Sequence, residues 1–268
     1  MTLIDTISII VPDHTVLELL LSLTLCMILG LFAYWRGILD ASGATASFMI
    51  GLIIAVFANI YWLITLICFL IFTYIVTKID FSYKILHGVA QGRYGERSAV
   101  NVLANGSIPA LIAVFRFQLG YPLAGILFVC SISAAASDSF ANEIGVLSDK
   151  AYLITDLNKR VRPGTDGGVS RLGQTAAIAG AFIPAMFGWL LVSEFNNNLI
   201  PVTQLSQMPM TAFTLLLPLI FGFVGCQIDS VLGATLQRRK ILTNDGVNFF
   251  SILITVLMAF MIILVIPI

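Results

Sequence analysis

The chain has 268 residues, of which 59% are hydrophobic and only 10% are charged. Soluble domains carry about 25% charged residues, so this composition excludes an ordinary soluble domain and indicates an integral membrane protein. The formal net charge is zero, which argues against nucleic acid as a partner. The four cysteines lie far apart, each inside an apolar run, which favours small buried side chains over disulfides or a metal site.

A helix needs about 20 mostly apolar residues to cross a bilayer. Such stretches lie at 15–35, 41–60, 61–78, 100–118, 121–144, 170–193, 211–235 and 247–267. The second and third are joined almost without a loop, and polar residues and a proline interrupt the fourth. The sequence therefore predicts an all-α, polytopic membrane protein with about eight transmembrane helices, in a single integral membrane domain over residues 1–268.

The basic residues favour one orientation of these helices. All of them except Arg116 fall in the first, third, fifth and seventh connections between the predicted spans. The positive-inside rule makes that face cytoplasmic, which places both termini on the non-cytoplasmic side. Because the same connections carry most of the unusual polar residues, we expect the active site on the cytoplasmic face.

The fifth predicted span carries a polar stripe. Positions 131, 135, 138, 142 and 145 repeat at helical spacing and hold Ser, Ala, Asp, Asn and Gly. Small residues are typical of a close helix–helix seam, but a seam does not explain a carboxylate. A charged side chain at membrane depth costs roughly 2.5–3.5 kcal/mol on insertion scales, and such residues mark functional sites. Asp138 is therefore a candidate functional residue.

The seventh predicted span repeats this design. Gly222, Gly225 and Asp229 share one helical face, and Ser230 follows directly. Two carboxylates from different helices can hold Mg²⁺, which prefers oxygen ligands and completes its octahedron with water and phosphate. The alternative is an isolated Asp229 that bonds to a neighbouring arginine or to the backbone.

A basic, glycine-rich segment follows the fifth span over residues 158–171. Glycines permit close backbone approach to a ligand, and successive amides form an anion-binding nest. The segment leads into the next helix, whose N-terminus favours phosphate. The alternative is an ordinary basic loop that obeys the topology rule. The residues in question are Lys159, Arg160, Arg162, Gly164, Thr165, Gly167, Gly168 and Ser170.

Further polar clusters lie at the starts of other helices. Arg97, Asn101 and Asn105 recur every fourth residue, so one face of the fourth span is polar from its start. The eighth span begins with a cluster in which Asn244 or Asp245 can also serve as a helix N-cap. The members of this cluster are Asn244, Asp245 and Asn248. Two interpretations stay open for the cluster and for Asp40, namely a contact with a ligand or a helix cap.

Five ordered motifs together resemble one family. They are Gly92-Arg-x-Gly-x-Arg97, Asn101-Val-Leu-Ala-Asn105-Gly106, Asp138-Ser-x-Ala-x-x-x-Gly145, Pro163-Gly-Thr-x-Gly-Gly-Val and Leu242-Thr-Asn-Asp-x-Val-Asn248. The set is similar to the phytyl-phosphate kinase family, within the membrane CTP-transferase superfamily that includes dolichol kinase and CDP-diacylglycerol synthase. The resemblance covers about residues 36–260, nearly the whole chain.

The resemblance implies transfer of the CTP γ-phosphoryl group to a prenyl monophosphate, giving the diphosphate. It implies that Asp138 and Asp229 hold Mg²⁺, with Glu143 as a third acid. It implies that Lys159, Arg160 and Arg162 hold phosphates with help from the amides of residues 164–168. The remaining nucleotide or acceptor contacts it implies are Asn101, Asn105, Asn244, Asp245 and Asn248.

Three hypotheses about function therefore compete. The first is a CTP-dependent kinase of a phytyl- or geranylgeranyl-type monophosphate. The second is a cytidylyltransferase that forms a CDP-lipid on the same nucleotide and metal site. The third is a lipid or ion transporter, although the chain shows no clear internal repeat of the kind that transporters carry. The sequence leaves open the prenyl chain length, the nucleotide preference and whether the protein forms a homo-oligomer in the lipid membrane.

Overall fold

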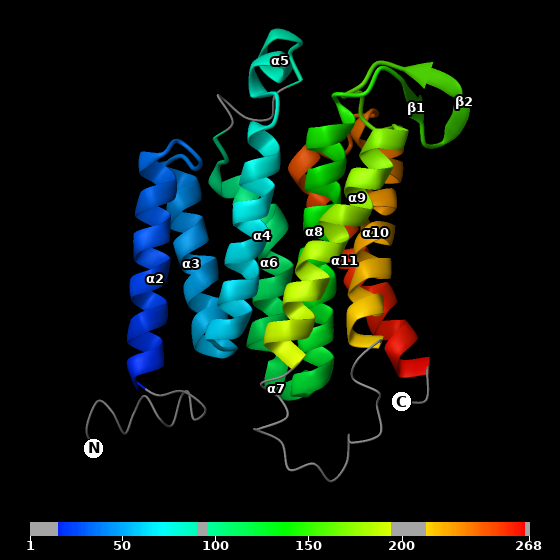
Figure 1. The fold of residues 1–268 in the computed structure, drawn as a ribbon. Coiled ribbons are helices and arrows are strands. Elements are labelled where there is room, and N and C mark those ends of the chain that lie inside the picture. The colour runs from blue at the N-terminus through cyan, green and yellow to red at the C-terminus, as the bar shows by residue number, and fades with distance from the viewer. Residues whose placement is uncertain (1–15, 90–95, 194–212, 266–268) are drawn as a thin grey trace.

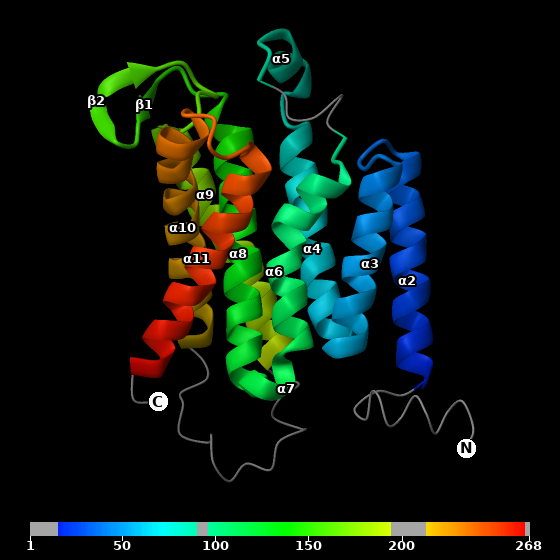
Figure 2. The same cartoon turned by 180° about the vertical axis from the view of Figure 1, so that it is seen from behind.

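The protein is an antiparallel bundle of long helices (Figure 1). The computed structural model describes residues 16–89, 96–193 and 213–265. Successive long helices run in opposite directions, so their connections alternate between the two ends of the bundle (Figure 2). The long helices are α2 (Val16–Trp35), α3 (Ala41–Phe57), α4 (Ile60–Lys78), α6 (Ala99–Val114), α8 (Tyr121–Gly145), α9 (Arg171–Gly188), α10 (Phe213–Leu232) and α11 (Asn244–Val265).

Helices occur at all eight places where the sequence predicts a span. Six of the helices in the described residues are long and apolar enough to cross a membrane. The other two, α3 and α6, are shorter apolar helices. The mostly helical membrane architecture is therefore confirmed, whereas eight full crossings and the sidedness of the termini stay predictions.

The connection between α8 and α9 differs from the expected all-α fold. It forms a small antiparallel sheet of order β2-β1-β3, with β1 (Ala151–Leu153) pairing to both β2 (Asp156–Val161) and β3 (Gly168–Val169). The sequence predicts a loop here, because β1 and β3 are very short and β2 is exposed along nearly its whole length, with no alternating pattern. The sheet lies beyond the end of the helices, on the upper right in Figure 1.

Helix α8 forms the centre of the bundle. It contacts α4, α6, α9, α10 and α11, and 89% of its apolar stretch is buried inside the protein, against 11% for α2. Its neighbours approach closely through glycines. The Gly145 backbone lies against Gly173 of α9, and Gly222 of α10 lies against Ser133 of α8. The stripe of small residues on α8 therefore forms a helix–helix seam, which is one of the two roles that the sequence suggested for it.

Polar residues set the starts of several helices. Asn59 accepts hydrogen bonds from the Tyr61 and Trp62 amides, so α4 begins with only two residues between it and the end of α3. Asp40 accepts a hydrogen bond of 2.7 Å from the Gly43 amide and thus caps α3. This is the capping role that the sequence left open for Asp40, and it secures the start of α3.

Short elements complete both ends of the bundle. At the end that carries the sheet, α5 (Phe81–Leu86) follows α4 and a π-helix, η3 (Gly233–Gln237), extends α10. At the opposite end lies α7 (Arg116–Leu119), and a second π-helix, η1 (Trp189–Ser193), extends α9. π-helical turns often occur at functional sites, and η3 begins about one helical turn after Asp229 and Ser230, at the end of α10.

Candidate active site

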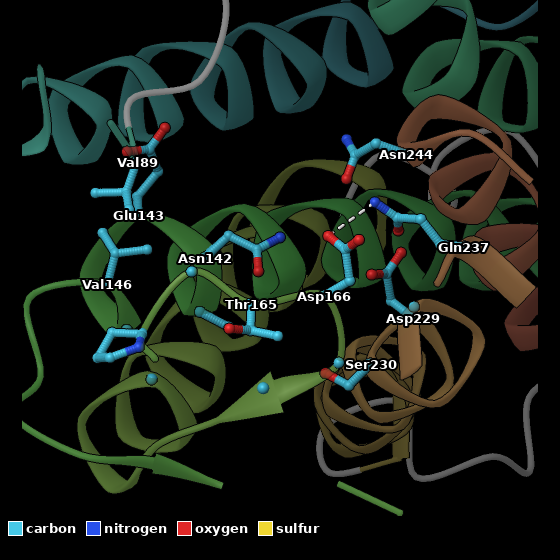
Figure 3. Close-up of a pocket in the computed structure, with 18 of the residues that line it drawn as sticks. Val89, Asn142, Glu143, Val146, Thr165, Asp166, Asp229, Ser230, Gln237 and Asn244 are labelled. Carbon is cyan, nitrogen blue, oxygen red and sulfur yellow. Dashed lines mark hydrogen bonds between the residues drawn. The ribbon is translucent and has the colours of Figure 1, made fainter. Parts of the chain in front are cut away.

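A cavity of about 720 Å³ lies at the end of the bundle that carries the sheet. Its walls come from the C-terminal end of α8, the β2–β3 connection, η3 and the N-terminal ends of α6, α9 and α11. Figure 3 shows side chains from these separate segments converging on one space. Because helix N-termini carry a partial positive charge and free amides, such a wall favours an anionic ligand.

Two carboxylates from different helices meet below this cavity. Asp138 of α8 and Asp229 of α10 are both buried, and their carboxyl groups lie close enough to affect each other electrostatically. Asp229 also lines the cavity (Figure 3). The pairing of these two residues is the arrangement that the sequence analysis predicted from the parallel design of the fifth and seventh spans.

Neighbouring polar groups hold the two carboxylates in place. The Asn142 side-chain amide donates a hydrogen bond of 2.8 Å to Asp138 Oδ2, and the Ser251 hydroxyl donates one of 3.1 Å to Asp229 Oδ2. Asn248 lies one turn before Ser251 on α11 and is buried, but it does not line the cavity. These bonds orient the carboxylates without cancelling their charge.

The donor set is compatible with Mg²⁺. Within the described residues, no cluster of three or more His, Cys, Asp or Glu side chains is placed to hold a metal ion. Mg²⁺ is commonly bound by one or two carboxylates, with water and substrate phosphates as its other ligands. A buried pair of like charges also requires a cation or a proton to be stable. Asp138 and Asp229 therefore fit a magnesium site that a phosphate ligand completes.

Glu143 lies at a different part of the cavity wall and already has partners. Its Oε2 lies 2.6 Å from the Lys84 ammonium, and its Oε1 accepts a hydrogen bond of 3.0 Å from the Thr77 hydroxyl. Figure 3 shows Glu143 well apart from Asp229. With both oxygens engaged, Glu143 is less suited to binding a metal than the two aspartates, and its role as a third acidic ligand stays a prediction.

The glycine-rich segment forms a second wall. Gly164 and Gly167 have left-handed backbone conformations, with φ of 84° and 71°. A Cβ on Gly167 would overlap Ala234 of η3, so the segment packs directly on the end of α10. The Gln237 side-chain amide donates a hydrogen bond of 3.0 Å to Asp166 Oδ1 at this junction (Figure 3).

Most of the predicted nucleotide contacts line this cavity, and two do not. Asn105 donates to the Asn101 carbonyl oxygen within α6, one turn below the cavity, and Asn248 lies beside Ser251. At the cavity itself the Asn101 amide donates a hydrogen bond of 3.1 Å to Asp245 Oδ1, which joins α6 to α11. The residues at the cavity are Asn101, Gly164, Thr165, Gly167, Gly168, Ser170, Asn244 and Asp245.

The three basic residues predicted to hold phosphates lie outside the cavity lining. Lys159 and Arg160 are exposed on β2, and the Arg160 guanidinium donates to the Asp149 carbonyl oxygen. The Arg162 guanidinium donates a hydrogen bond of 2.8 Å to the His87 carbonyl oxygen. Arg97 lines the cavity instead.

Sequence reasoning did not include Arg97 and Lys84 among the site residues. Arg97 had a usable signal, because it begins the polar face that continues through Asn101. Lys84 had none, because a lysine in a short connection is typical of the cytoplasmic face of any membrane protein. Its burial follows from the position of α5 against the ends of α4 and α8, which only the folded structure defines.

Comparisons with known proteins support the membrane assignment. The chain is 31% identical to "Uncharacterized membrane protein MJ0933" of Methanocaldococcus jannaschii, over 90% of this chain and 92% of that protein. It is 28% identical to "Protein PGR" of Arabidopsis thaliana, over 89% of this chain and 93% of that protein. It is 29% identical to "Protein VTE6, chloroplastic" of the same plant, over 80% of this chain and 62% of that protein.

The match to a protein family covers residues 24–256, which include every residue that lines the cavity and nearly all of the bundle. No solved structure matches the chain. The family is described as "Integral membrane protein DUF92", and its match agrees with the resemblance that the five sequence motifs indicated. This chain belongs to that family of integral membrane proteins.

Proposed function

We propose that this protein is a CTP-dependent kinase that converts a prenyl monophosphate into the diphosphate. The observation that carries the proposal is the pair of buried carboxylates from α8 and α10, placed below a cavity whose walls are helix N-termini and a glycine-rich segment. Phosphoryl transfer mainly requires that two phosphates be positioned and their charge neutralised. The residues around the cavity supply groups for both tasks.

Each part of the cavity has a role in this proposal. Asp138 and Asp229 hold Mg²⁺, which neutralises negative charge on the phosphates when bound. The amides of the Gly164–Gly168 segment and the N-terminus of α9 bind the nucleotide phosphates. Asn101 and Asp245, which are hydrogen-bonded to each other, position the base or the acceptor.

The reaction needs no general base from the protein. An oxygen of the prenyl monophosphate attacks the γ-phosphorus of CTP, the bond from that phosphorus to the β–γ bridging oxygen breaks, and CDP leaves. The acceptor phosphate is already ionised near neutral pH, so no proton has to be removed. The prenyl chain extends sideways between helices into the lipid, while its phosphate lies in the cavity at the cytoplasmic face.

CTP labelled separately at the α- and the γ-phosphorus tests this proposal. Purified protein would be incubated with Mg²⁺, geranylgeranyl or phytyl monophosphate and one of the labelled nucleotides. A kinase places the γ-label in the lipid and leaves the α-label in CDP. A cytidylyltransferase places the α-label in the lipid and the γ-label in pyrophosphate. The absence of both products, across several prenyl phosphates, would contradict the proposal and favour transport.

A further inference from the structure

The charged residues that line the cavity are strongly unbalanced. Six acidic residues line it, and Arg97 is the one basic residue among the lining residues that the structure describes. Among these described lining residues, Arg97 is therefore the cationic side chain that an anionic ligand can contact directly. The acidic residues in the lining are Asp40, Glu96, Glu143, Asp166, Asp229 and Asp245.

The backbone of Arg97 is fixed between two parts of the bundle. The Arg97 amide donates a hydrogen bond of 3.0 Å to the Ile38 carbonyl oxygen, and the Asp40 amide donates one of 3.2 Å to the Arg97 carbonyl oxygen. Helix α6 begins two residues later, with Ser98 at its N-cap position. Arg97 is thus held beside a helix N-terminus, where a phosphate also finds free amides.

The side chain of Arg97 has acidic neighbours but no direct bond to them. Its charge is attracted by Glu143 and Asp138. Within the described part of the chain, the guanidinium donates no hydrogen bond to either carboxylate. A guanidinium has five N–H donors in a planar fork that matches the oxygens of a phosphate.

The buried Lys84 explains why Glu143 does not capture Arg97. Lys84 is 0% exposed, and its ammonium donates to Glu143 Oε2 at 2.6 Å, to the Thr77 carbonyl at 3.1 Å and to the Val76 carbonyl at 3.3 Å. These contacts use all three of its donors. Thr77 Oγ1 lies 3.0 Å from the other oxygen of Glu143, so both oxygens of this carboxylate already have a polar partner.

We propose that Arg97 binds a phosphate group of the substrate and that Lys84 is a positioning residue that keeps Arg97 available by holding Glu143. The inference rests on the proposed function for the identity of the phosphate, which belongs either to the nucleotide or to the prenyl monophosphate. Without Lys84, Glu143, which already attracts the charge of Arg97, is free to pair with the guanidinium. The cavity would then contain no unpaired cation among its described lining residues.

Binding measurements with purified protein in nanodiscs test the role of Arg97. The probes are CTP with Mg²⁺ and geranylgeranyl monophosphate with Mg²⁺, each measured alone by equilibrium dialysis. We expect the dissociation constant of at least one probe to rise about tenfold or more in Arg97→Gln, with a smaller rise in Arg97→Lys. Arg239→Gln, at an exposed position outside the cavity, is the matched control.

The two probes identify the phosphate that Arg97 contacts. A rise for CTP alone assigns Arg97 to the nucleotide, and a rise for the lipid alone assigns it to the acceptor. Equal affinity of Arg97→Gln and the wild-type protein for both probes would overturn the inference, even if the protein turned out to be a kinase. Arg97-dependent binding without turnover would contradict the proposed kinase while supporting the inference.

A double variant tests the role of Lys84. Lys84→Met is expected to weaken binding to a similar degree, because Glu143 is then free to pair with Arg97. Lys84→Met combined with Glu143→Gln removes both charges, and we expect binding close to that of the wild-type protein. Because the stability of these variants is also expected to be non-additive, binding is compared at a temperature at which the melting curve of each variant shows it fully folded. A folded double variant that binds as weakly as Arg97→Gln would overturn the positioning role.

Discussion

Two carboxylates that face each other in a protein interior repel strongly, because the low dielectric constant screens their charges poorly. Asp138 and Asp229 are in this position, and the hydrogen bonds from Asn142 and Ser251 orient them without neutralising them. A divalent cation between the two carboxylates would remove the repulsion without the bound proton that the metal-free pair otherwise requires. The metal-free protein should therefore be less stable than the metal-bound one.

Mg²⁺ is expected to raise the melting temperature of the wild-type protein in detergent. Asp138→Asn should melt at a higher temperature than the wild-type protein without metal, since one of the repelling charges is gone. It should show no further rise with Mg²⁺, and its kinase activity should fall about a hundredfold or more. Asp149→Asn, which changes an exposed carboxylate outside the cavity, serves as the control. An equal Mg²⁺ response in both variants would argue against the metal site.

Because Lys84 and Glu143 form a buried ion pair, we expect each single substitution to destabilise the protein more than the double substitution does. Removal of one partner leaves a buried charge without compensation, which typically costs about 3–5 kcal/mol. Lys84→Met and Glu143→Gln should each destabilise the protein by that order, whereas the double variant should lose less than either. Reversible unfolding in mixed micelles would measure this, with the exposed Lys150→Met as control. Additive losses in the double variant would show that the two charges do not depend on each other.

At the scale of elements, the cavity depends on how the glycine-rich segment packs on η3. The contact between Gly167 and Ala234 brings the β2–β3 connection against the end of α10, close to Asp229. The Gln237–Asp166 hydrogen bond joins the same two elements. A displacement of this segment should therefore reduce nucleotide binding more than it reduces overall stability.

Gly167→Ala is the substitution that tests this packing. Its methyl group would overlap Ala234, so the segment has to move away from η3. Gly88→Ala is the matched control, because Gly88 has a similar φ of 65° but an added Cβ there meets no atom within 4 Å. We expect both variants to lose about 1–2 kcal/mol from backbone strain. Only Gly167→Ala should also weaken CTP binding, and equal CTP affinity in the two would contradict the proposed contact.

The long helices were predictable because each is a long run of apolar residues, and such a run is stable only in a membrane or in a large protein core. The Asp138–Asp229 pair was also predictable, because carboxylates are rare in such runs and both lie near the same end of their spans. The small sheet at 151–169 was not, since β1 and β3 have only three and two residues and the six residues of β2 show no alternation of buried and exposed positions. Lys84 was not predictable either, because exposed Lys159 and buried Lys84 look alike in a sequence, whereas Arg97 begins the polar face of α6 and could have been included.

At the scale of the whole molecule, the structure places the cavity and most of the basic connections at one end of the bundle. Arg36, Lys84, Arg160 and Arg238 belong to that end, and Arg116 belongs to the other (Figure 1). The positive-inside rule then predicts that the cavity opens to the cytoplasm. A water-soluble nucleotide donor is accessible from that side.

Labelling of single engineered cysteines tests this orientation. Leu157→Cys lies on the exposed β2 strand at the cavity end, and Gln118→Cys lies on α7 at the other end. A membrane-impermeant maleimide should label the first only in inside-out vesicles and the second only in right-side-out vesicles. Of the native cysteines, Cys26, Cys130 and Cys226 are buried, and the unmodified protein corrects for labelling of Cys68. The reverse pattern would contradict a cytoplasmic active site.

The central claim is that the two-aspartate cavity transfers a phosphoryl group to a prenyl monophosphate. Mass spectrometry of the lipid, after incubation of purified protein with CTP, Mg²⁺ and geranylgeranyl monophosphate, tests it most directly. We predict geranylgeranyl diphosphate as the product of the wild-type protein, and unchanged monophosphate with Asp138→Asn. A CDP-lipid, or diphosphate formed equally well by Asp138→Asn, would contradict the account.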